Sequence, residues 1–352
     1  MSAFVESPLS ACVARVRPAH LLLWRDPDIG LEAVLALDDL TLGPAAGGIR
    51  TRPYATLEDA ADDAMALARA MTLKCAIGGL AAGGGKLVVR QRPDMDRAAV
   101  FSAIGRRVAS LGGLFRTAGD LGTTLEDLRR VAAETGFVHL EERALAGAVA
   151  RGLVRCVEAA RAAWLGEAPR RGLAGLSVAV QGAGVIGAAA CARLVADGAR
   201  VLVADVDAAR AARVAAETGA TVVSPDEVCA AEVDVFAPCA VGGVVDLEVA
   251  RSLRARAVVG AANNVLATPE AEDALAARGV WFVPDFIASG GAVVDGIGET
   301  VMGLADRGPL VDALGAVAHR VLVEARASGA RATVVAERHA RARIAAAATT
   351  RG

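Results

Sequence analysis

The chain has 352 residues, of which 54% are hydrophobic, 22% charged and 3% aromatic. This composition supplies a large aliphatic core and excludes a disordered chain, and the length is typical of two domains. The formal net charge is −2 and the sequence contains no basic block, which argues against nucleic acid or an anionic membrane surface as the main partner.

Cysteine and histidine usage indicates a cytoplasmic protein without a metal site. No two cysteines form a CxxC pair, and none has a histidine nearby at metal-ligand spacing, so we expect reduced, mostly buried thiols. The N-terminus has no long apolar stretch behind a basic start, and charge or glycine interrupts the other apolar runs. The six cysteines are Cys12, Cys75, Cys156, Cys191, Cys229 and Cys239.

The N-terminal third is predicted to mix strands and helices. Aliphatic residues gather at 21–24 and 31–39, on either side of a turn rich in Asp, Pro and Gly, which indicates two strands. Thr56 and Asp59 form a capping-box pattern at the start of a helix over 55–71, whose small and apolar residues recur on one face.

A second capping-box pattern follows further along the first domain. Thr124 and Asp127 have the same spacing ahead of another helical segment. Between the two helices, residues 115–123 contain two glycines and are predicted to form a short loop.

Residues 78–89, GGLAAGGGKLVV, place five glycines ahead of Lys86 and an apolar run. A phosphate-binding P-loop would need glycine at position 80 and Ser or Thr at position 87, but both are leucine. The segment could be a flexible turn before a buried strand, with a solvated lysine at its edge. We favour glycines that let the backbone and a substrate pack tightly around Lys86, because glycine weakens a fold unless a close approach needs it.

An alanine-rich helical pattern over 144–166 marks the predicted domain boundary. We expect a substrate and catalytic domain over 1–145 and a nucleotide-binding domain over 146–324, with the C-terminal helix of about 325–352 packing back on the first. Short apolar strands alternate with helices beyond the boundary, which predicts a parallel sheet covered on both faces. The fold class is therefore α/β with a Rossmann-type second domain, and an inter-domain cleft is expected.

A dinucleotide-binding pattern lies near the start of the second domain. The segment Gly182-Ala183-Gly184-Val185-Ile186-Gly187 stands between a predicted strand and a helix, and Asp205 ends the next strand. In this context the glycines allow the tight turn, the approach of a pyrophosphate and close helix packing. Asp205 would bind ribose hydroxyls and repel a 2′-phosphate, and no arginine follows at once, which favours NAD over NADP. FAD, or a glycine-rich turn that binds nothing, remains an alternative.

Two lysines of the first domain point to anion chemistry. Lys74 and Lys86 are twelve residues apart in apolar and glycine-rich surroundings, where they make more sense facing an anion than as structural residues. Asp120 is a possible proton-transfer partner. A free lysine has a pKa of about 10.4, and both desolvation and a nearby cation favour the neutral amine that a base requires.

The sequence resembles the glutamate/leucine/phenylalanine/valine dehydrogenase family. The resemblance rests on GPAAGGIR at 43–50, ARAMTLKCAIGGLAAGGGKLVV at 68–89 and TAGDLGTT at 117–124, and it continues in the nucleotide half with VQGAGVIG, FAPCAVGG, VVGAANNVL and VPDFIASGG. It implies NAD-dependent, reversible oxidative deamination of an L-amino acid to a 2-oxo acid and ammonia. It also implies a homo-oligomer.

The resemblance implies roles for individual residues. Lys74 would bind the substrate carboxylate, Lys86 would polarise the carbonyl oxygen and activate water, and Asp120 would shuttle protons to and from the amino nitrogen. Gly47 and Gly48 would line the substrate site. The implied contacts in the nucleotide half are Asn264 with the substrate or nicotinamide, and Asp205, Val206, Cys239, Ala240, Val241 and Asn263 with the cofactor.

Two positions depart from the family pattern. Val149 stands where the family usually has Thr, and Ser289 where it usually has Asn; these changes could alter specificity or weaken catalysis. By alignment, the small residues Ala46 and Gly119 lie near the side-chain pocket, which predicts an aliphatic or aromatic substrate. An NAD-binding regulatory protein and a hydroxy-acid dehydrogenase remain as alternatives, although the latter would need a catalytic histidine that cannot be placed.

Overall fold

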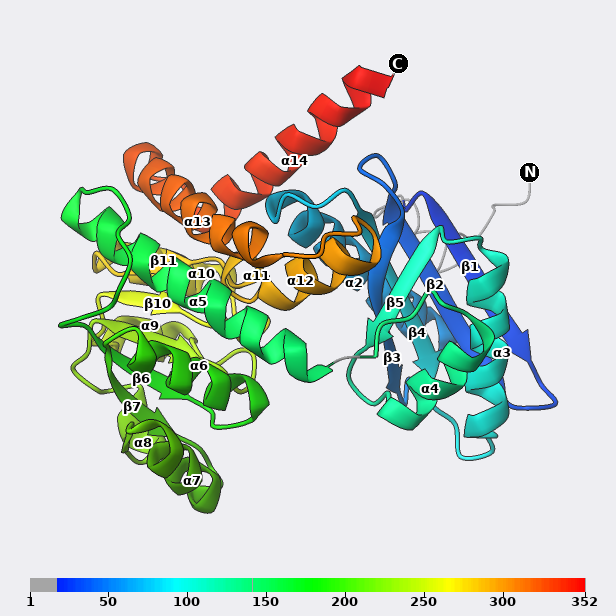
Figure 1. Cartoon of the computed structure of the whole chain (residues 1–352), viewed down its shortest axis with the longest axis horizontal. Coiled ribbons are helices and arrows are strands. Elements are labelled where there is room, and N and C mark those ends of the chain that lie inside the picture. The colour runs from blue at the N-terminus through cyan, green and yellow to red at the C-terminus, as the bar shows by residue number, and fades with distance from the viewer. Residues whose placement is uncertain (1–17, 141, 352) are drawn as a thin grey trace, which may run out of the picture. The chain divides into compact units, whose positions relative to one another are not determined.

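The computed structural model describes residues 18–140 and 142–351, which form two compact units (Figure 1). The first unit contains the described residues up to 142 together with 296–305 and 340–351; the second contains 143–295 and 306–339. The predicted α/β class, with one parallel Rossmann-type sheet, is confirmed. No helix in the described part of the chain has the length and apolarity that a membrane crossing needs.

The first unit is built on a mixed five-stranded sheet with the order β1-β2-β4-β3-β5. Strand β2 is antiparallel to β1 and β4, whereas β3 is parallel to β4 and β5. The strands are β1 His20–Asp26, β2 Leu31–Asp39, β3 Ala45–Arg52, β4 Gly83–Arg90 and β5 Phe115–Gly119.

Strand β5 corrects the loop predicted over 115–123. Its glycine and short length are typical of a loop, but Phe115 is fully buried and the segment pairs in parallel with β3 from Ala45 to Ile49. This tertiary pairing outweighs local sequence preference. Residues 120–123 then form the turn that carries Asp120.

Three helices cover this sheet: α2 Leu57–Ile77, α3 Arg97–Ser110 and α4 Leu125–Glu134. Both predicted capping boxes are present, at Thr56 with Asp59 and at Thr124 with Asp127. Helix α2 runs past the predicted end at residue 71, so Lys74 lies in its last turn and not beyond it.

The two faces of the sheet have separate cores. Helices α3 and α4 pack on the face that carries Leu35, Leu87 and Val89, while α2 packs on the face that carries Val34 and Val88. Successive side chains of a strand point to opposite faces. The residue between Gly85 and Leu87 therefore lies on the α2 face.

Three of the five glycines ahead of Lys86, Gly83 to Gly85, lie inside strand β4, whereas Gly78 and Gly79 form the turn that ends α2. A Cβ atom at Gly83 would lie 1.7 Å from the carbonyl oxygen of Asp39, and one at Gly84 would lie 2.1 Å from the amide nitrogen of Thr72. At Gly85 it would lie 2.9 Å from the ring of Phe115. The close packing is therefore against the protein's own strand, helix and core.

The second unit holds a six-stranded sheet with the order β11-β10-β9-β6-β7-β8, in which every strand pairing is parallel. The chain changes direction across the sheet between β6 and β9, which is where ligands bind in such folds. The strands are β6 Ser177–Gln181, β7 Arg200–Ala204, β8 Thr221–Val222, β9 Val235–Pro238, β10 Ala257–Val259 and β11 Trp281–Val283.

Helices alternate with these strands and continue beyond them. Residues 340–351 of the last helix belong to the first unit, where the Arg343 guanidinium donates to the carbonyls of Cys75, Ala76 and Leu80. The helices are α5 Glu142–Leu165, α6 Val185–Ala196, α7 Ala208–Thr218, α8 Pro225–Val228, α9 Leu247–Ser252, α10 Pro269–Ala277, α11 Asp285–Ala288, α12 Gly291–Thr300, α13 Gly308–Ser328 and α14 Ala332–Arg351.

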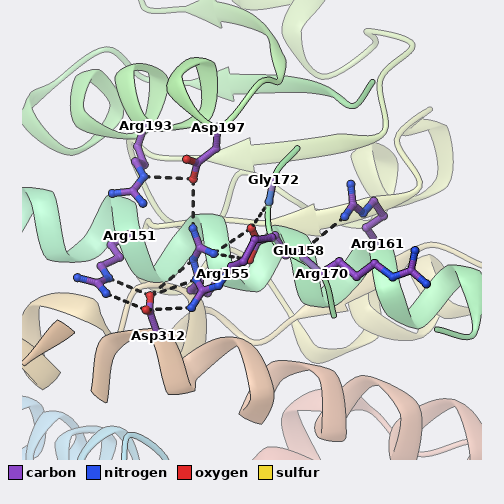
Figure 2. Close-up of polar contacts among 10 residues, drawn as sticks. Arg151, Arg155, Glu158, Arg161, Arg170, Gly172, Arg193, Asp197 and Asp312 are labelled. Carbon is purple, nitrogen blue, oxygen red and sulfur yellow. Dashed lines mark hydrogen bonds and ion pairs between the residues drawn. The ribbon is translucent and has the colours of Figure 1, made fainter. Parts of the chain in front are cut away.

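A charge network joins α5 to α13 and to the end of α6 (Figure 2). Arg151 donates to both oxygens of Asp312, at 2.8 and 2.7 Å. The buried Arg155 donates to Glu158 at 2.7 Å and to Asp197 at 3.2 Å. These contacts fix the long helix against the elements that surround the parallel sheet.

The five described cysteines, Cys75, Cys156, Cys191, Cys229 and Cys239, are free thiols, four of them buried. Burial raises the pKa of Cys75, Cys156, Cys191 and Cys239 to about 12, so their thiols remain protonated at neutral pH. Cys12 lies outside the described residues.

Replacing Gly84 by alanine is expected to destabilise the protein by about 2 to 3 kcal/mol, because its Cβ would overlap backbone atoms of α2. The free energy of unfolding from urea denaturation measures the loss. Gly136→Ala is the matched control, since a Cβ there would meet nothing within 4 Å. Equal stability of the two variants would contradict this account of the glycines.

Asp312→Asn is expected to lower the free energy of unfolding in a pH-dependent way. The hydrogen bond from Arg151 is the main cause that lowers the pKa of Asp312 to about 2. The carboxylate therefore stabilises the fold above about pH 4 and loses this effect as the pH falls toward 2, which corresponds to about 2 kcal/mol at neutral pH. Denaturation at pH 7 and at pH 3 should give a difference between variant and unmodified protein that shrinks at the lower pH. Glu232→Gln, which removes an exposed loop carboxylate of the same unit, is the matched control and should have a much smaller effect at pH 7.

Candidate active site

Lys86 lies in the middle of β4, on the face covered by α2. Ala36 stands opposite Lys86 on β2, and only 8% of the Lys86 side chain is exposed. Its Nζ atom lies 2.6 Å from Oδ2 of Asp120, which follows the last residue of β5. A buried ammonium group needs such a partner, because an isolated charge is costly away from water.

The predicted glycines of β3 lie beside this pair. A Cβ atom at Gly48 would lie 3.0 Å from the Cβ of Asp120, and one at Gly47 would lie 1.7 Å from the carbonyl oxygen of Gly85. Side chains at either position would therefore push the strand that carries Lys86 away from the turn that carries Asp120. The structure brings together four predicted residues, Gly47, Gly48, Lys86 and Asp120.

Three further side chains belong to this cluster and were not predicted. Arg50 Nε lies 2.9 Å from the same Asp120 oxygen, and Arg50 Nη1 lies 3.2 Å from Oδ2 of Asp63. Tyr54 donates its hydroxyl to that Asp63 oxygen at 2.5 Å. Arg50 is the last residue of the GPAAGGIR segment and follows Gly48 by two positions. This closeness in sequence to a predicted site residue could have identified it.

The charges of the cluster act in opposite directions on the two central groups. Burial lowers the pKa of Lys86, and the cation of Arg50 adds to this effect, while the carboxylate of Asp120 opposes it. Burial alone would raise the pKa of Asp120, but Lys86 and Arg50 together hold it below its ordinary value. Asp120 is thus an anion at neutral pH beside an amine that gives up its proton more easily than a free lysine does.

Lys74 projects from the last turn of α2 in the same unit and is half-buried. Asn263 and Asn264 belong to the second unit, in the loop after β10. Asn264 has a φ of 53°, the only positive φ of a non-glycine residue in the described chain, and its carbonyl accepts from Gly243 at 2.7 Å. The loops that follow β9 and β10 therefore lie side by side.

The glycine motif forms the predicted turn between β6 and α6. Gly182 has a φ of 101°, and a Cβ atom there would lie 2.6 Å from the Cβ of Ala240. At Gly187 a Cβ would lie 1.9 Å from the Gly182 carbonyl oxygen. Gly184, the N-cap residue, instead faces open space and provides no side-chain cap to the first-turn amides.

These features fit a dinucleotide. Uncapped amides at the start of a helix bind phosphate through hydrogen bonds and the helix dipole. The Oε1 atom of Gln181, next to Gly182, is buried and has no hydrogen-bond partner among the described residues. Cys239 and Ala240 line the opposite side of the turn, because the Cys239 amide donates to the Gln181 carbonyl at 2.7 Å.

Asp205 lies just beyond β7, beside the glycine turn. Its carboxylate accepts from the amide of Ala183 at 2.7 Å and from that of Asp207 at 2.9 Å. Arg210, which was not predicted, reaches it at 3.3 Å and also pairs with Asp207. Val206 is 92% exposed next to this acid.

The two departures from the family pattern occur around one tight contact in the second unit. A Cβ atom at Gly291 would lie 2.1 Å from the carbonyl oxygen of Ala148 and 2.8 Å from the Cα of Val149. Val149 and Ser289 are both buried, and the Ser289 hydroxyl has no hydrogen-bond partner among the described residues.

Comparisons with known proteins place these sites in a family. Residues 25–136 match the model described as Glu/Leu/Phe/Val dehydrogenase, dimerisation domain, and residues 203–351 match that of glutamate/leucine/phenylalanine/valine dehydrogenase. The chain is 37% identical to leucine dehydrogenase of Geobacillus stearothermophilus, over 78% of this chain and 76% of that protein. It is 34% identical to phenylalanine dehydrogenase of Bacillus thermotolerans, over 78% and 74%.

A solved structure agrees with these sequence matches. The crystal structure of L-tryptophan dehydrogenase from Nostoc punctiforme superimposes with a TM-score of 0.86 at 32% identity, over 96% of this chain and 99% of that one. Because relatives above 30% identity match most of both sequences, the chain belongs to the glutamate/leucine/phenylalanine/valine dehydrogenase family and is an amino acid dehydrogenase that uses a nicotinamide cofactor.

Proposed function

We propose that this enzyme oxidises an aliphatic or aromatic L-amino acid reversibly to the 2-oxo acid and ammonia, with NAD as cofactor and with Lys86 and Asp120 as its proton-handling pair. The observation that carries the proposal is the 2.6 Å contact between the two groups, at a site where 8% of the Lys86 side chain and 25% of the Asp120 side chain are exposed. A hydrogen-bonded acid and base of shifted pKa is what general acid–base catalysis requires.

Lysine usage in the whole chain supports this assignment. Lys74 and Lys86 are its only two lysines, although lysine and arginine together number 38. Arginine cannot be deprotonated in a protein, whereas a buried lysine can. Arginine thus occupies the other 36 of these positions, and an amine is present at both residues proposed to contact the substrate, Lys74 and Lys86.

Each proposed residue has a distinct role. The cofactor supplies the hydride acceptor, and the chain's own residues bind, orient and exchange protons. Lys74 would bind the substrate carboxylate, Lys86 would polarise the substrate oxygen and activate water, and Asp120 would move protons to and from the amino nitrogen. Gly47 and Gly48 would border the substrate by backbone, and Asn264 would contact its polar groups.

NAD is proposed because Asp205 is held in place as an anion. Two backbone amides fix its carboxylate and, against the effect of burial, lower its pKa. A ribose with free hydroxyls can donate to this carboxylate, while a 2′-phosphate would be repelled. Arg210 does not reverse this preference, since Asp205 and Asp207 both neutralise it. Gly182 to Gly187 would hold the pyrophosphate, with Val206, Cys239, Ala240 and Asn263 as further cofactor contacts.

The substrate class follows from the relatives and from the small residues beside the pair. Relatives at 34 to 37% identity carry the names leucine and phenylalanine dehydrogenase. Ala46 and Gly48 lie on the Lys86 face of β3 and occupy little space. We further propose a homo-oligomer in the cytoplasm, supported by the match to a dimerisation domain and by the free thiols.

Amino acid oxidation can be tested directly with purified protein. NADH should form from NAD and leucine, valine, phenylalanine or tryptophan at alkaline pH, and NADH oxidation by the matching 2-oxo acid should require ammonium. NADP should be a much poorer cofactor. Turnover that is indifferent to ammonium would contradict the proposed reaction.

Lys86→Ala is expected to lower kcat/KM by at least about 100-fold, because it removes the proton-transfer group. Lys86→Arg should be similarly impaired, since it keeps the positive charge but cannot release the proton at neutral pH. NADH affinity, measured by cofactor fluorescence, should stay close to that of the unmodified protein in both variants. Normal turnover by Lys86→Arg would overturn the role given to the amine.

A further inference from the structure

We propose that Arg50 is a positioning residue of the reaction, which holds the Asp120 carboxylate against the Lys86 amine and favours release of the proton from that amine. This inference rests on the proposed function, since it concerns how the same pair is controlled. Nothing in the family motifs alone distinguishes Arg50 from a strand residue that only stabilises the fold.

The first argument is geometric. Arg50 Nε and Lys86 Nζ approach the same oxygen of Asp120, at 2.9 and 2.6 Å. One carboxylate oxygen can accept both hydrogen bonds, so the negative charge of Asp120 is shared between Lys86 and Arg50. The guanidinium also fixes the direction of the carboxylate, because its planar fork binds in few orientations.

The second argument concerns what fixes Arg50 itself. Its Nη1 lies 3.2 Å from Asp63 on α2, and Asp63 also accepts the Tyr54 hydroxyl at 2.5 Å. Burial and the neighbouring Asp63 raise the pKa of Tyr54, so the phenol stays protonated and remains a donor. Arg50 thus bridges two carboxylates from different elements, and only 19% of its side chain is exposed.

The third argument is electrostatic. The charged groups around Lys86 are Arg50 from β3, Asp120 after β5 and Asp63 from α2, while Ala36 faces it from β2. Arg50 favours loss of the Lys86 proton, and the two carboxylates oppose it. Removing Arg50 and removing Asp63 should therefore move the titration of Lys86 in opposite directions.

The two-lysine composition permits a direct test. Lysine labelled with carbon-13 at Cε gives two side-chain signals from the intact protein, and Lys74→Arg identifies which one belongs to Lys86. In Arg50→Gln the acid dissociation constant of Lys86 should fall at least about tenfold, because a nearby like charge is lost. In Asp63→Asn the acid dissociation constant of Lys86 should increase, because a nearby carboxylate is lost. Arg52→Gln, which removes an exposed cation from the same strand, is the matched control and should leave it unchanged.

Steady-state kinetics provide the second readout. Arg50→Gln should lower kcat by about 10- to 100-fold, as expected for a misplaced catalytic group, with a smaller change in KM for the amino acid. The pH profile of kcat/KM should shift to higher pH. Arg50→Lys should recover part of kcat, because it restores the charge but not the bridge to both carboxylates. NADH affinity should be unchanged in every variant.

The possible outcomes separate this inference from the proposed function. If Arg50→Gln leaves the Lys86 titration and the pH profile as in the unmodified protein, Arg50 is only structural and the inference is wrong. If Arg50→Gln and Asp63→Asn shift the Lys86 titration in the same direction, the inference is also refuted, because that result would indicate that each variant loosens the packing around Lys86. If the unmodified protein forms no NADH from aliphatic or aromatic L-amino acids, or oxidises NADH without requiring ammonium, it is the proposed function that fails.

Discussion

The contact between the Lys86 amine and the Asp120 carboxylate is the interaction on which the geometry of the candidate active site depends. Neither charge is stable alone in a site with so little exposure, and the pair forms only because β4 and β5 lie on either side of β3. The glycines of β3 and β4 permit that spacing, since a Cβ at Gly47 would overlap the Gly85 carbonyl. The glycines carry a cost in backbone entropy, and in return they allow these two charged groups to approach each other.

Arginine supplies most of the positive charge of this protein, and lysine occurs at two positions, Lys74 and Lys86. Arg50, Arg155 and Arg343 all occupy sites with limited exposure, and each binds several carboxylate or carbonyl oxygens in a fixed geometry. A guanidinium suits such positions because it presents several donors and keeps its charge. Lysine is retained at two positions in the first unit, and at Lys86 burial shifts the amine toward its neutral form.

Local patterns predicted much of the fold, and contacts distant in sequence explain the errors. Capping boxes depend on residues three apart, and the glycine turn before α6 depends on six consecutive residues, so both could be found from sequence. Strand β5 could not, because its parallel pairing with β3 outweighs a composition typical of loops. Arg50 was missed for the same reason: its partners Asp63 and Asp120 are 13 and 70 residues away.

The substitutions at Val149 and Ser289 are best understood through packing. Both lie in the second unit, whereas the Lys86 and Asp120 pair is built entirely by the first. Valine fills its buried site on α5 without needing a hydrogen bond, and Ser289 keeps one buried hydroxyl whose partner is not supplied by the described residues. A buried polar atom costs free energy unless it is paired, so this hydroxyl is suited to a ligand contact. The two substitutions therefore act on packing and on one buried hydroxyl of the second unit, and they change no residue of the Lys86 and Asp120 cluster.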